Sequence, residues 1–218
     1  MNQLIVTGDG SHTIFVPGMN EHYHSIHGAV QESQHIFIKN GFETVQSGYV
    51  NIFEAGFGTG LNALLTAVRN IECGKKVNYV TVEKYPLPVE IISFLNYWQF
   101  AGKEGEKIFR LLHSAPWDEE FYINENFRIK KIRDDLTVMA LRGNYDLIYF
   151  DAFGPDKQPD MWSDDVFSKI SSVTEKEGIF VTYSAKGEIK RRLKANGFEV
   201  SLLPGPPGKR QMIRAVKI

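Results

Sequence analysis

The feature that most constrains this chain is a glycine-rich turn between an apolar run and a helical pattern. Residues 49–53 are mostly apolar and are followed by Glu54, by glycines at positions 56, 58 and 60, and by leucines at helical spacing from Leu61. This order predicts a strand, a tight turn and a helix. Glycine suits such a turn because it adopts positive φ angles and leaves a ligand free to approach the backbone. The turn therefore predicts a nucleotide-like ligand.

The spacing of the glycines narrows the choice of ligand. Gly56, Gly58 and Gly60 form the pattern Gly-x-Gly-x-Gly, and Glu54 stands two residues before the first glycine. The dinucleotide fingerprint is Gly-x-Gly-x-x-Gly and does not require that glutamate. The present pattern is common at S-adenosylmethionine (SAM) sites, where the glutamate can face the cationic methionine end. We therefore expect SAM as the cofactor, and a glycine-rich turn without a ligand is the alternative.

Length and composition restrict the class of protein. The chain has 218 residues, which favours one main domain, and we expect residues 1–45 to form an elaboration packed on a SAM-binding methyltransferase domain at 46–218. It has one cysteine, Cys73, no long apolar run and no signal-peptide pattern, which predicts a cytoplasmic protein without membrane association. The net charge of −1 gives no general attraction to nucleic acid.

Alternating strand and helix patterns predict an α/β fold. Strand patterns cover residues 49–53, 77–83, 127–132, 145–151 and 178–184. Helix patterns cover residues 61–72, 86–98, 108–112 and 188–195. We expect a Rossmann-like, mostly parallel sheet with right-handed crossovers. Residues 198–203 and 211–217 predict a C-terminal antiparallel hairpin, and residues 13–16 predict a small N-terminal β elaboration.

Acidic residues stand at or just past the ends of predicted strands. They are Glu54, Glu83, Asp135 and Asp151. Ligands of such folds bind at the carboxyl ends of the strands, so these acids should meet at one edge of the sheet. Glu83 follows the glycine turn at the distance where a carboxylate meets ribose hydroxyls. Asp135 would lie near the adenine edge or cap the segment that begins at Leu136. The predicted cofactor-binding residues are Glu54, Gly56, Phe57, Gly58, Thr59, Gly60, Asn62, Glu83 and Asp135.

Asp151 and the loop after it are the candidates for chemistry. The loop carries Phe153, Pro155 and Pro159, so it should be stiff and should lie beside the cofactor. An amine acceptor arrives protonated and must lose a proton before it attacks a sulfonium methyl group. The carboxylate of Asp151 can hold that ammonium group and accept the proton, and Phe153 can line the acceptor pocket or simply pack. A strand-end carboxylate that caps the next turn is the alternative reading of Asp151.

Two further segments carry polar groups. Residues 21–28 hold three histidines, and we expect a substrate-entry loop there that includes Tyr23, His24 and Ser25, rather than a metal site. Lys209 and Arg210 follow a turn rich in proline and glycine. They can contact phosphates or form a solvated face.

Two of these motifs, with others near the C-terminus, resemble the MnmC-type tRNA methyltransferases. Residues 54–62 resemble that family's Gly-Phe-Gly-Thr-Gly-Leu-Asn signature, and residues 150–162 resemble its acceptor loop. Residues 182–185 and 208–212 are similar to its late motifs. Two departures lie in the acceptor loop, where Ala152 replaces a usual glycine and Gln158 a usual asparagine. They put the shape of the loop in doubt rather than the chemistry.

The resemblance implies a function. Members of this family use SAM to methylate the amino group of 5-aminomethyl-(2-thio)uridine at the wobble position, in the anticodon region of tRNA. It implies that the glycine turn and Glu83 bind SAM and that Asp151 is the acid of the acceptor site. Some members are fused to an FAD-dependent oxidase domain. We expect the stand-alone form here, with a separate enzyme supplying the aminomethyl precursor. The alternatives are an aminopropyltransferase of the spermidine synthase type and a non-catalytic nucleotide-binding module.

Overall fold

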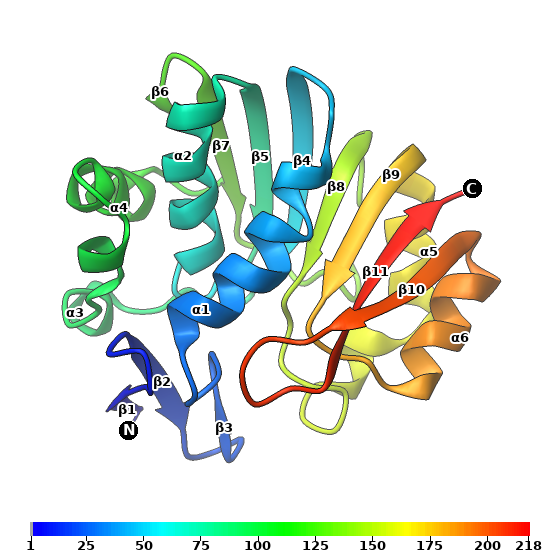
Figure 1. The fold of residues 1–218 in the computed structure, drawn as a ribbon, viewed down its shortest axis with the longest axis horizontal. Coiled ribbons are helices and arrows are strands. Elements are labelled where there is room, and N and C mark those ends of the chain that lie inside the picture. The colour runs from blue at the N-terminus through cyan, green and yellow to red at the C-terminus, as the bar shows by residue number, and fades with distance from the viewer. Residues whose placement is uncertain (1) are drawn as a thin grey trace.

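The computed structural model describes residues 2–218, which form two β-sheets with helices on both faces of the larger one (Figure 1). The smaller sheet is antiparallel and contains β1 (Gln3–Val6), β2 (His12–Val16) and β3 (Glu21–His22). It lies next to the lower ends of the central strands in the view of Figure 1. The expected N-terminal β elaboration is therefore present. The division of the chain at residue 45 stays a prediction.

The larger sheet has eight strands in the order β10-β11-β9-β8-β4-β5-β7-β6. Its parallel strands are β4 (Tyr49–Ala55), β5 (Lys76–Val82), β7 (Phe127–Ile132), β8 (Tyr145–Phe150) and β9 (Thr174–Thr182). Its antiparallel strands are β6 (Glu120–Asn124), β10 (Phe198–Pro204) and β11 (Gln211–Lys217). The mostly parallel sheet and the C-terminal hairpin are thus confirmed.

The central strands are buried on both faces because helices cover both sides of the sheet. Residues 147–150 of β8 are fully buried, as expected for a parallel strand between two helical layers. Successive residues of β4 belong to different cores: Ile52 packs on one face and Phe53 on the other. This alternation explains why the central strands read as continuous apolar runs.

The helices divide between the two faces. One face is covered by α1 (Ala29–Ser33), the π-helical turn that continues it (Gln34–Lys39), α2 (Leu61–Cys73) and α4 (Gly105–Ser114). The other face is covered by α5 (Asp164–Val173) and α6 (Gly187–Ala195). Helix α5 was not predicted, although Ser163 gives its start: the hydroxyl accepts a hydrogen bond from the Val166 N–H.

The predicted helix over residues 86–98 is wrong. The structure has only a four-residue helix, α3 (Val89–Ile92), and a 3-10 turn (Tyr97–Phe100). No residue of α3 is fully buried, and the buried residues of the predicted helix, Leu95 and Tyr97, lie after α3 ends. Tertiary packing therefore does not stabilise one continuous helix over the whole segment. Strand β6 was also not predicted. It forms the edge of the sheet and pairs only with β7, across an irregular register between Tyr122 and Asn124.

Candidate functional site

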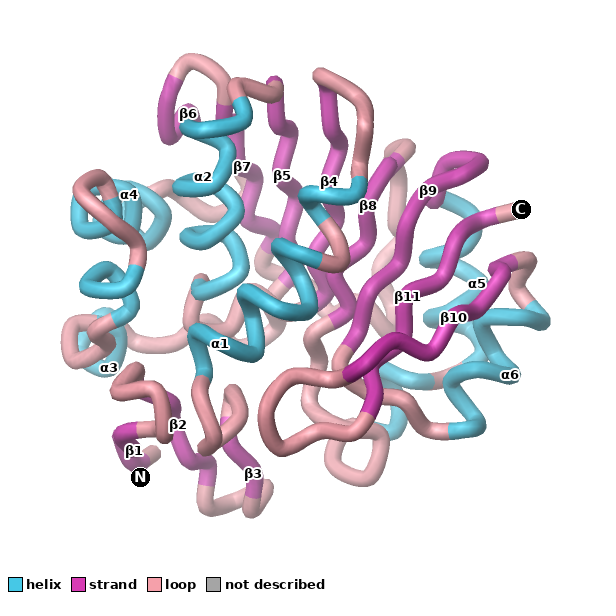
Figure 2. The backbone as a smooth tube through the Cα atoms, in the orientation of Figure 1, coloured by secondary structure: helices cyan, strands magenta, loops and turns pink. Residues whose placement is uncertain are grey.

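A cavity of about 830 Å³ opens at the carboxyl ends of β4, β5 and β8. Its wall includes residues that directly follow each of these strands: Gly56, Glu83 and Asp151. The opposite wall comes from Met19, from residues 21–27, which form β3 and the segment after it, and from Gly208 and Lys209 before β11. Figure 2 shows loop segments gathered at this edge of the sheet, between the strands and the N-terminal sheet. The fold thus brings distant parts of the sequence into one site.

The glycine turn has the conformation that its sequence predicts. Gly56, Gly58 and Gly60 have φ angles of 94°, 50° and 73°, a region that disfavours side chains. A β-carbon on Gly56 would lie 3.2 Å from the Asp151 carbonyl oxygen, and one on Gly58 would lie 3.2 Å from the Tyr23 ring. Gly60 caps helix α2 in a left-handed conformation and does not line the cavity. Five residues of the predicted set near the turn do line it: Gly56, Phe57, Gly58, Thr59 and Asn62.

Glu83 and Asp135 both reach the cavity from the ends of neighbouring strands. The Glu83 carboxylate accepts hydrogen bonds from the backbone N–H of Gly58 at 3.1 Å and of Tyr85 at 2.8 Å. Asp135 accepts from the Thr137 N–H at 2.9 Å, which makes it a local turn cap, and pairs with Lys84 at 2.7 Å. The Lys84 ammonium group and Thr137 hold the pKa of Asp135 low, at about 2. Asp135 therefore caps a turn and lines the cavity at once.

Glu54 does not lie where we expected it. Its side chain points into the core of the sheet, is fully buried and does not line the cavity. Burial raises its pKa to about 8, against the lowering effect of the nearby Thr81 and Tyr79 hydroxyls. The structure thus does not bring Glu54 to the cavity as a counter-ion for a cationic ligand. The physical reason is that β4 continues to Ala55, so residue 54 is an inward-facing strand position rather than part of the turn.

Asp151 is held at the centre of the site. Its backbone N–H donates to the Ala55 carbonyl at 3.1 Å, and its Oδ2 accepts from Nδ2 of Asn62 at 2.8 Å. Burial, with a smaller contribution from the negative charge of Glu32, raises its pKa to about 7. The Asn62 hydrogen bond and the positive charge of Lys209 oppose this rise. A carboxyl group in this state can change its protonation near neutral pH.

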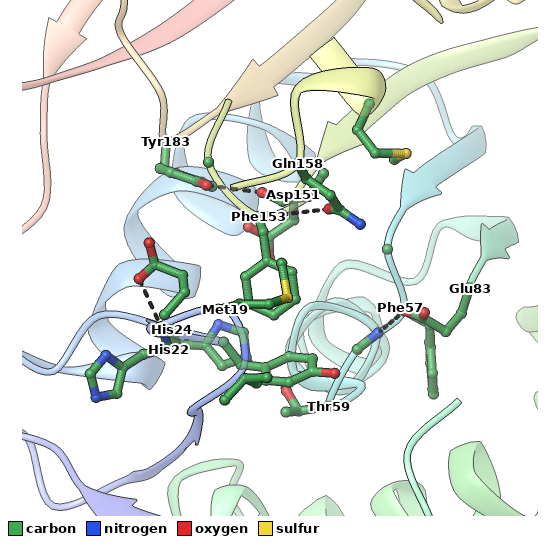
Figure 3. A pocket seen from close by; sticks show the side chains of 18 of the residues that line it. Met19, His22, His24, Phe57, Thr59, Glu83, Asp151, Phe153, Gln158 and Tyr183 are labelled. Carbon is green, nitrogen blue, oxygen red and sulfur yellow. Dashed lines mark hydrogen bonds between the residues drawn. The ribbon is translucent and has the colours of Figure 1, made fainter. Parts of the chain in front are cut away.

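The loop after Asp151 is fixed by hydrogen bonds to its backbone, as Figure 3 shows in part. The Phe153 N–H donates to Oε1 of Gln158 at 3.2 Å, and the Phe153 carbonyl accepts from the Trp162 indole at 2.7 Å. The Tyr183 hydroxyl donates to the Ala152 carbonyl at 2.9 Å. The Phe153 ring meets the Tyr23 ring edge to face, with centroids 4.9 Å apart. The expected stiff loop is therefore present, and its aromatic ring faces the cavity.

The predicted entry loop contacts the glycine turn directly. Nε2 of His24 lies 2.7 Å from Oγ1 of Thr59, and burial lowers the His24 pKa to about 4, so the ring is neutral. The Ser25 N–H donates to Oε2 of Glu32 at 2.9 Å. Tyr23, His24 and Ser25 all line the cavity. Across residues 2–218, no group of three or more histidine, cysteine or acidic residues is arranged to hold a metal ion.

Lys209 and Arg210 have different surroundings. The Lys209 ammonium group pairs with Glu32 at the cavity wall and lies 4.2 Å above the centre of the Tyr183 ring. Arg210 is exposed and does not line the cavity. The two residues therefore do not form one basic patch, and the ammonium group of Lys209 already has a carboxylate partner.

Glu32 and Tyr183 also line the cavity, beside Lys209, although the sequence alone gave them no role. The sequence does carry a signal for Glu32, because this acid lies beside the apolar residues Ala29 and Val30 on a short helix. A carboxylate buried in such a place needs a cation as its partner. Residues 182–185 form one of the late motifs, but the motif alone assigns Tyr183 no role, because its neighbours in space are distant in the chain. Among the helices of residues 2–218, none has the length and apolar character needed to cross a membrane.

Comparison with known proteins agrees with this geometry. Residues 112–218 match a family model described as an S-adenosyl-L-methionine-dependent methyltransferase. Over 207 residues the chain is 30% identical to the tRNA 5-methylaminomethyl-2-thiouridine biosynthesis bifunctional protein MnmC of Campylobacter hominis, and 93% of this chain is covered. The chain is similar to this methyltransferase family over these residues.

A second MnmC protein matches the chain in a similar way. The MnmC protein of an Azoarcus species is 30% identical over 205 residues, which cover 88% of this chain. The chain spans about a third of the length of these curated relatives, 31% and 32% respectively. The relatives are named bifunctional, and this chain matches one part of them.

Solved structures share the fold of this chain. The crystal structure of MNMC2 from Aquifex aeolicus matches with a TM-score of 0.78 and 24% identity, covering 99% of this chain and 69% of that one. Spermidine synthase from Thermotoga maritima matches with a TM-score of 0.57 and 10% identity, covering 100% of this chain and 71% of that one. These matches confirm the Rossmann-like methyltransferase fold.

Proposed function

We propose that this chain transfers a methyl group from SAM to an amine on tRNA, converting 5-aminomethyl-(2-thio)uridine at the wobble position to its methylaminomethyl form. The observation that carries the proposal is the position of Asp151. Its carboxyl group shares one cavity with the glycine turn and Glu83, at the carboxyl edge of the sheet. The names of the MnmC relatives refer to biosynthesis of 5-methylaminomethyl-2-thiouridine in tRNA, which supports the choice of acceptor.

The residues of the cavity fit SAM. The two glycines of the turn that line it, Gly56 and Gly58, have positive φ angles and carry no β-carbon, which suits close approach of a ligand to the backbone. Residues 56–59 would hold the adenosine against the turn, Glu83 would bind the ribose hydroxyls and Asp135 would lie at the adenine edge. When bound, SAM supplies an activated methyl group on a sulfonium centre. Glu54 is left out of this set because it does not reach the cavity.

Asp151 has the properties that an amine acceptor requires. Its carboxylate would bind and orient the ammonium group of the acceptor and take up the proton that must leave before methyl transfer. A pKa of about 7 keeps the proton affinity of this group near the working pH. The rings of Phe153 and Tyr23 meet edge to face beside it and would exclude water from the acceptor. The wall formed by Glu32, Lys209 and Tyr183 would close the other side.

The proposed RNA contacts follow from charge and exposure. Arg210 is exposed next to the cavity wall and is proposed to contact a phosphate of the anticodon region. Lys209 is proposed to act inside the cavity instead, because Glu32 holds its ammonium group there. The reaction starts from an aminomethyl group, and we propose that a separate active site supplies it. A tRNA substrate also implies a cytoplasmic location for the chain.

A competition between acceptors tests the proposal. The chain is incubated with methyl-labelled SAM and either tRNA that bears the aminomethyl precursor or putrescine, a polyamine acceptor. Fully modified tRNA is the control without a free site. We expect label only in the precursor tRNA. In a second reaction, decarboxylated SAM replaces SAM, and transfer of its aminopropyl group to putrescine would favour the spermidine synthase alternative. Absence of transfer to any acceptor, with SAM bound, would favour a non-catalytic module.

A further inference from the structure

Buried polar atoms without a hydrogen-bond partner gather around one carboxyl group beneath the cavity. They are both carboxyl oxygens of Glu54, Oδ1 of Asn62 and the hydroxyl oxygens of Tyr79 and Thr81. The strand register explains why they meet: Thr81 on β5 stands directly opposite Glu54 on β4, and Tyr79 lies two residues before it on the same face. Polar groups buried in this way are normally paired, so the cluster calls for an arrangement that pairs them.

The charge around Glu54 decides its protonation state. Asn62 and the hydroxyls of Tyr79 and Thr81 are close enough to stabilise it, and none of them carries a positive charge. The ionisable groups that act on it or respond to it are Tyr79 on β5, Tyr149 on β8 and Asp151. Asp151 opposes ionisation of Glu54 because it has the same sign. A fully buried carboxyl group without a cation is more stable when it is neutral.

A neutral Glu54 has a proton to donate, and this proton completes the hydrogen bonding of the cluster. We propose that Glu54 is a protonated positioning residue whose hydroxyl donates to Oδ1 of Asn62, while the Asn62 amide donates to Asp151. Its other oxygen accepts from the Tyr79 and Thr81 hydroxyls. Every unpartnered atom of the cluster then has a partner.

This arrangement fixes the orientation of an amide that touches the reacting site. Nδ2 of Asn62 donates to Oδ2 of Asp151 at 2.8 Å, and Oδ1 of the same amide is buried without a partner. The hydroxyl of a protonated Glu54 would hold Oδ1 of Asn62 in place, whereas an ionised Glu54 carboxylate would repel that oxygen. Glu54 therefore acts on Asp151 through Asn62. It does not act as a counter-ion for the cofactor.

Two substitutions separate a neutral donor from a carboxylate. Glu54→Gln keeps the size and supplies a neutral donor and acceptor, whereas Glu54→Leu removes both. Binding of S-adenosylhomocysteine is measured by calorimetry, and kcat for aminomethyl-tRNA is measured across pH. We expect Glu54→Gln to stay within about threefold of wild type in both. Only the kcat measurement rests on the proposed function. If wild type binds no S-adenosylhomocysteine, the proposed function fails and the inference is judged by the infrared measurement below.

The leucine variant should show a specific pattern. We expect kcat to fall on the order of tenfold while KM for SAM stays unchanged, because Asp151 is misplaced and the cofactor site is intact. The acid limb of the pH profile should move to higher pH, because the Asn62 hydrogen bond lowers the pKa of Asp151. Equal loss of S-adenosylhomocysteine binding in Glu54→Gln and Glu54→Leu would overturn the inference, since it would show that the ligand needs the negative charge.

Infrared spectroscopy of the unmodified protein tests the same point without a variant. A carbonyl band of a protonated carboxylic acid should be present at neutral pH and should shift when the glutamates carry carbon-13. It should disappear as the pH is raised beyond about 8, where Glu54 ionises. Absence of a protonated glutamate at neutral pH would overturn the inference whatever the variants do.

Discussion

The side-chain amide of Asn62, in the first turn of helix α2, donates a hydrogen bond of 2.8 Å to the carboxyl group of Asp151 at the end of β8. The glycine turn that leads into α2 is the predicted cofactor site, and Asp151 is the predicted acceptor site. This contact therefore joins the two halves of the proposed reaction. It also makes the protonation of Asp151 depend on the residues behind it.

Removing the charge of Asp151 should separate binding from chemistry. In Asp151→Asn we expect S-adenosylhomocysteine binding close to wild type and methyl transfer slower on the order of 10²-fold, the usual scale for a positioned proton-transfer group. Raising the pH should recover part of the rate, because more of the amine is then already deprotonated. Calorimetry and single-turnover transfer of labelled methyl measure the two quantities. Wild-type turnover in this variant would remove Asp151 from the mechanism.

A side chain at Gly58 should block the cofactor. Gly58→Val places a branched side chain at a φ of 50° with its β-carbon 3.2 Å from the Tyr23 ring, where the backbone must stay open. We expect no detectable binding of SAM by calorimetry. Gly102→Val is the matched control, because Gly102 also has a positive φ, of 68°, and nothing lies within 4 Å of a β-carbon there. Retention of SAM binding in Gly58→Val, with the fold intact by circular dichroism, would move the cofactor away from the turn.

Arg210 should contribute to tRNA binding through a phosphate. Arg210→Ala should reduce the slope of log K against log salt by about 0.7 to 0.9, the value for one lost phosphate contact. SAM affinity should be unchanged. Lys209→Met should leave this slope unaltered and lower kcat instead, because Lys209 is paired with Glu32 inside the cavity. Filter binding over a salt series distinguishes the two variants. An unaltered slope in Arg210→Ala would assign that residue to the solvated surface.

Buried Glu54 should make stability depend on pH. Its pKa is raised from 4.5 to about 8 in the folded chain. Between pH 4.5 and about 8, the Glu54 carboxyl group is therefore ionised in the unfolded chain and neutral in the folded chain. The free energy of unfolding of wild type should therefore fall relative to that of Glu54→Gln as the pH rises from about 4.5 to about 8, by a few kcal/mol, and then level off. Urea unfolding of both proteins at several pH values measures the difference. A difference that does not vary with pH would contradict the buried position of this carboxyl group.

The fold was predictable where one local pattern was sufficient. Strand β4, the glycine turn and helix α2 follow from glycine spacing and helical periodicity, and the apolar run of β8 marks a strand buried on both faces. The helix predicted after Pro86 is limited to residues 89–92, and the buried residues of the segment, Leu95 and Tyr97, lie outside it, a property that periodicity does not reveal. Strand β6 was missed because edge strands are short and half exposed.

The site was predictable only in part, for a similar reason. Asp151, Glu83 and the glycine turn lie where strand-end reasoning puts them, because parallel strands end at one edge. The pairing of Lys209 with Glu32 joins residues that are 177 positions apart, and no local pattern connects them. Glu54 was assigned to the cavity because the strand was expected to end before it. The strand continues two residues further, to Ala55, and the side chain of Glu54 is therefore buried in the core.

Nucleoside mass spectrometry tests the central claim most directly. Purified protein is incubated with SAM and tRNA that bears the aminomethyl precursor, and the tRNA is then digested to nucleosides and analysed. We expect the 5-aminomethyl-(2-thio)uridine peak to be replaced by its methylaminomethyl form, with no methyl group on any other nucleoside and with little conversion by Asp151→Asn. An unchanged aminomethyl peak, or methylation at a different nucleoside, would contradict the account.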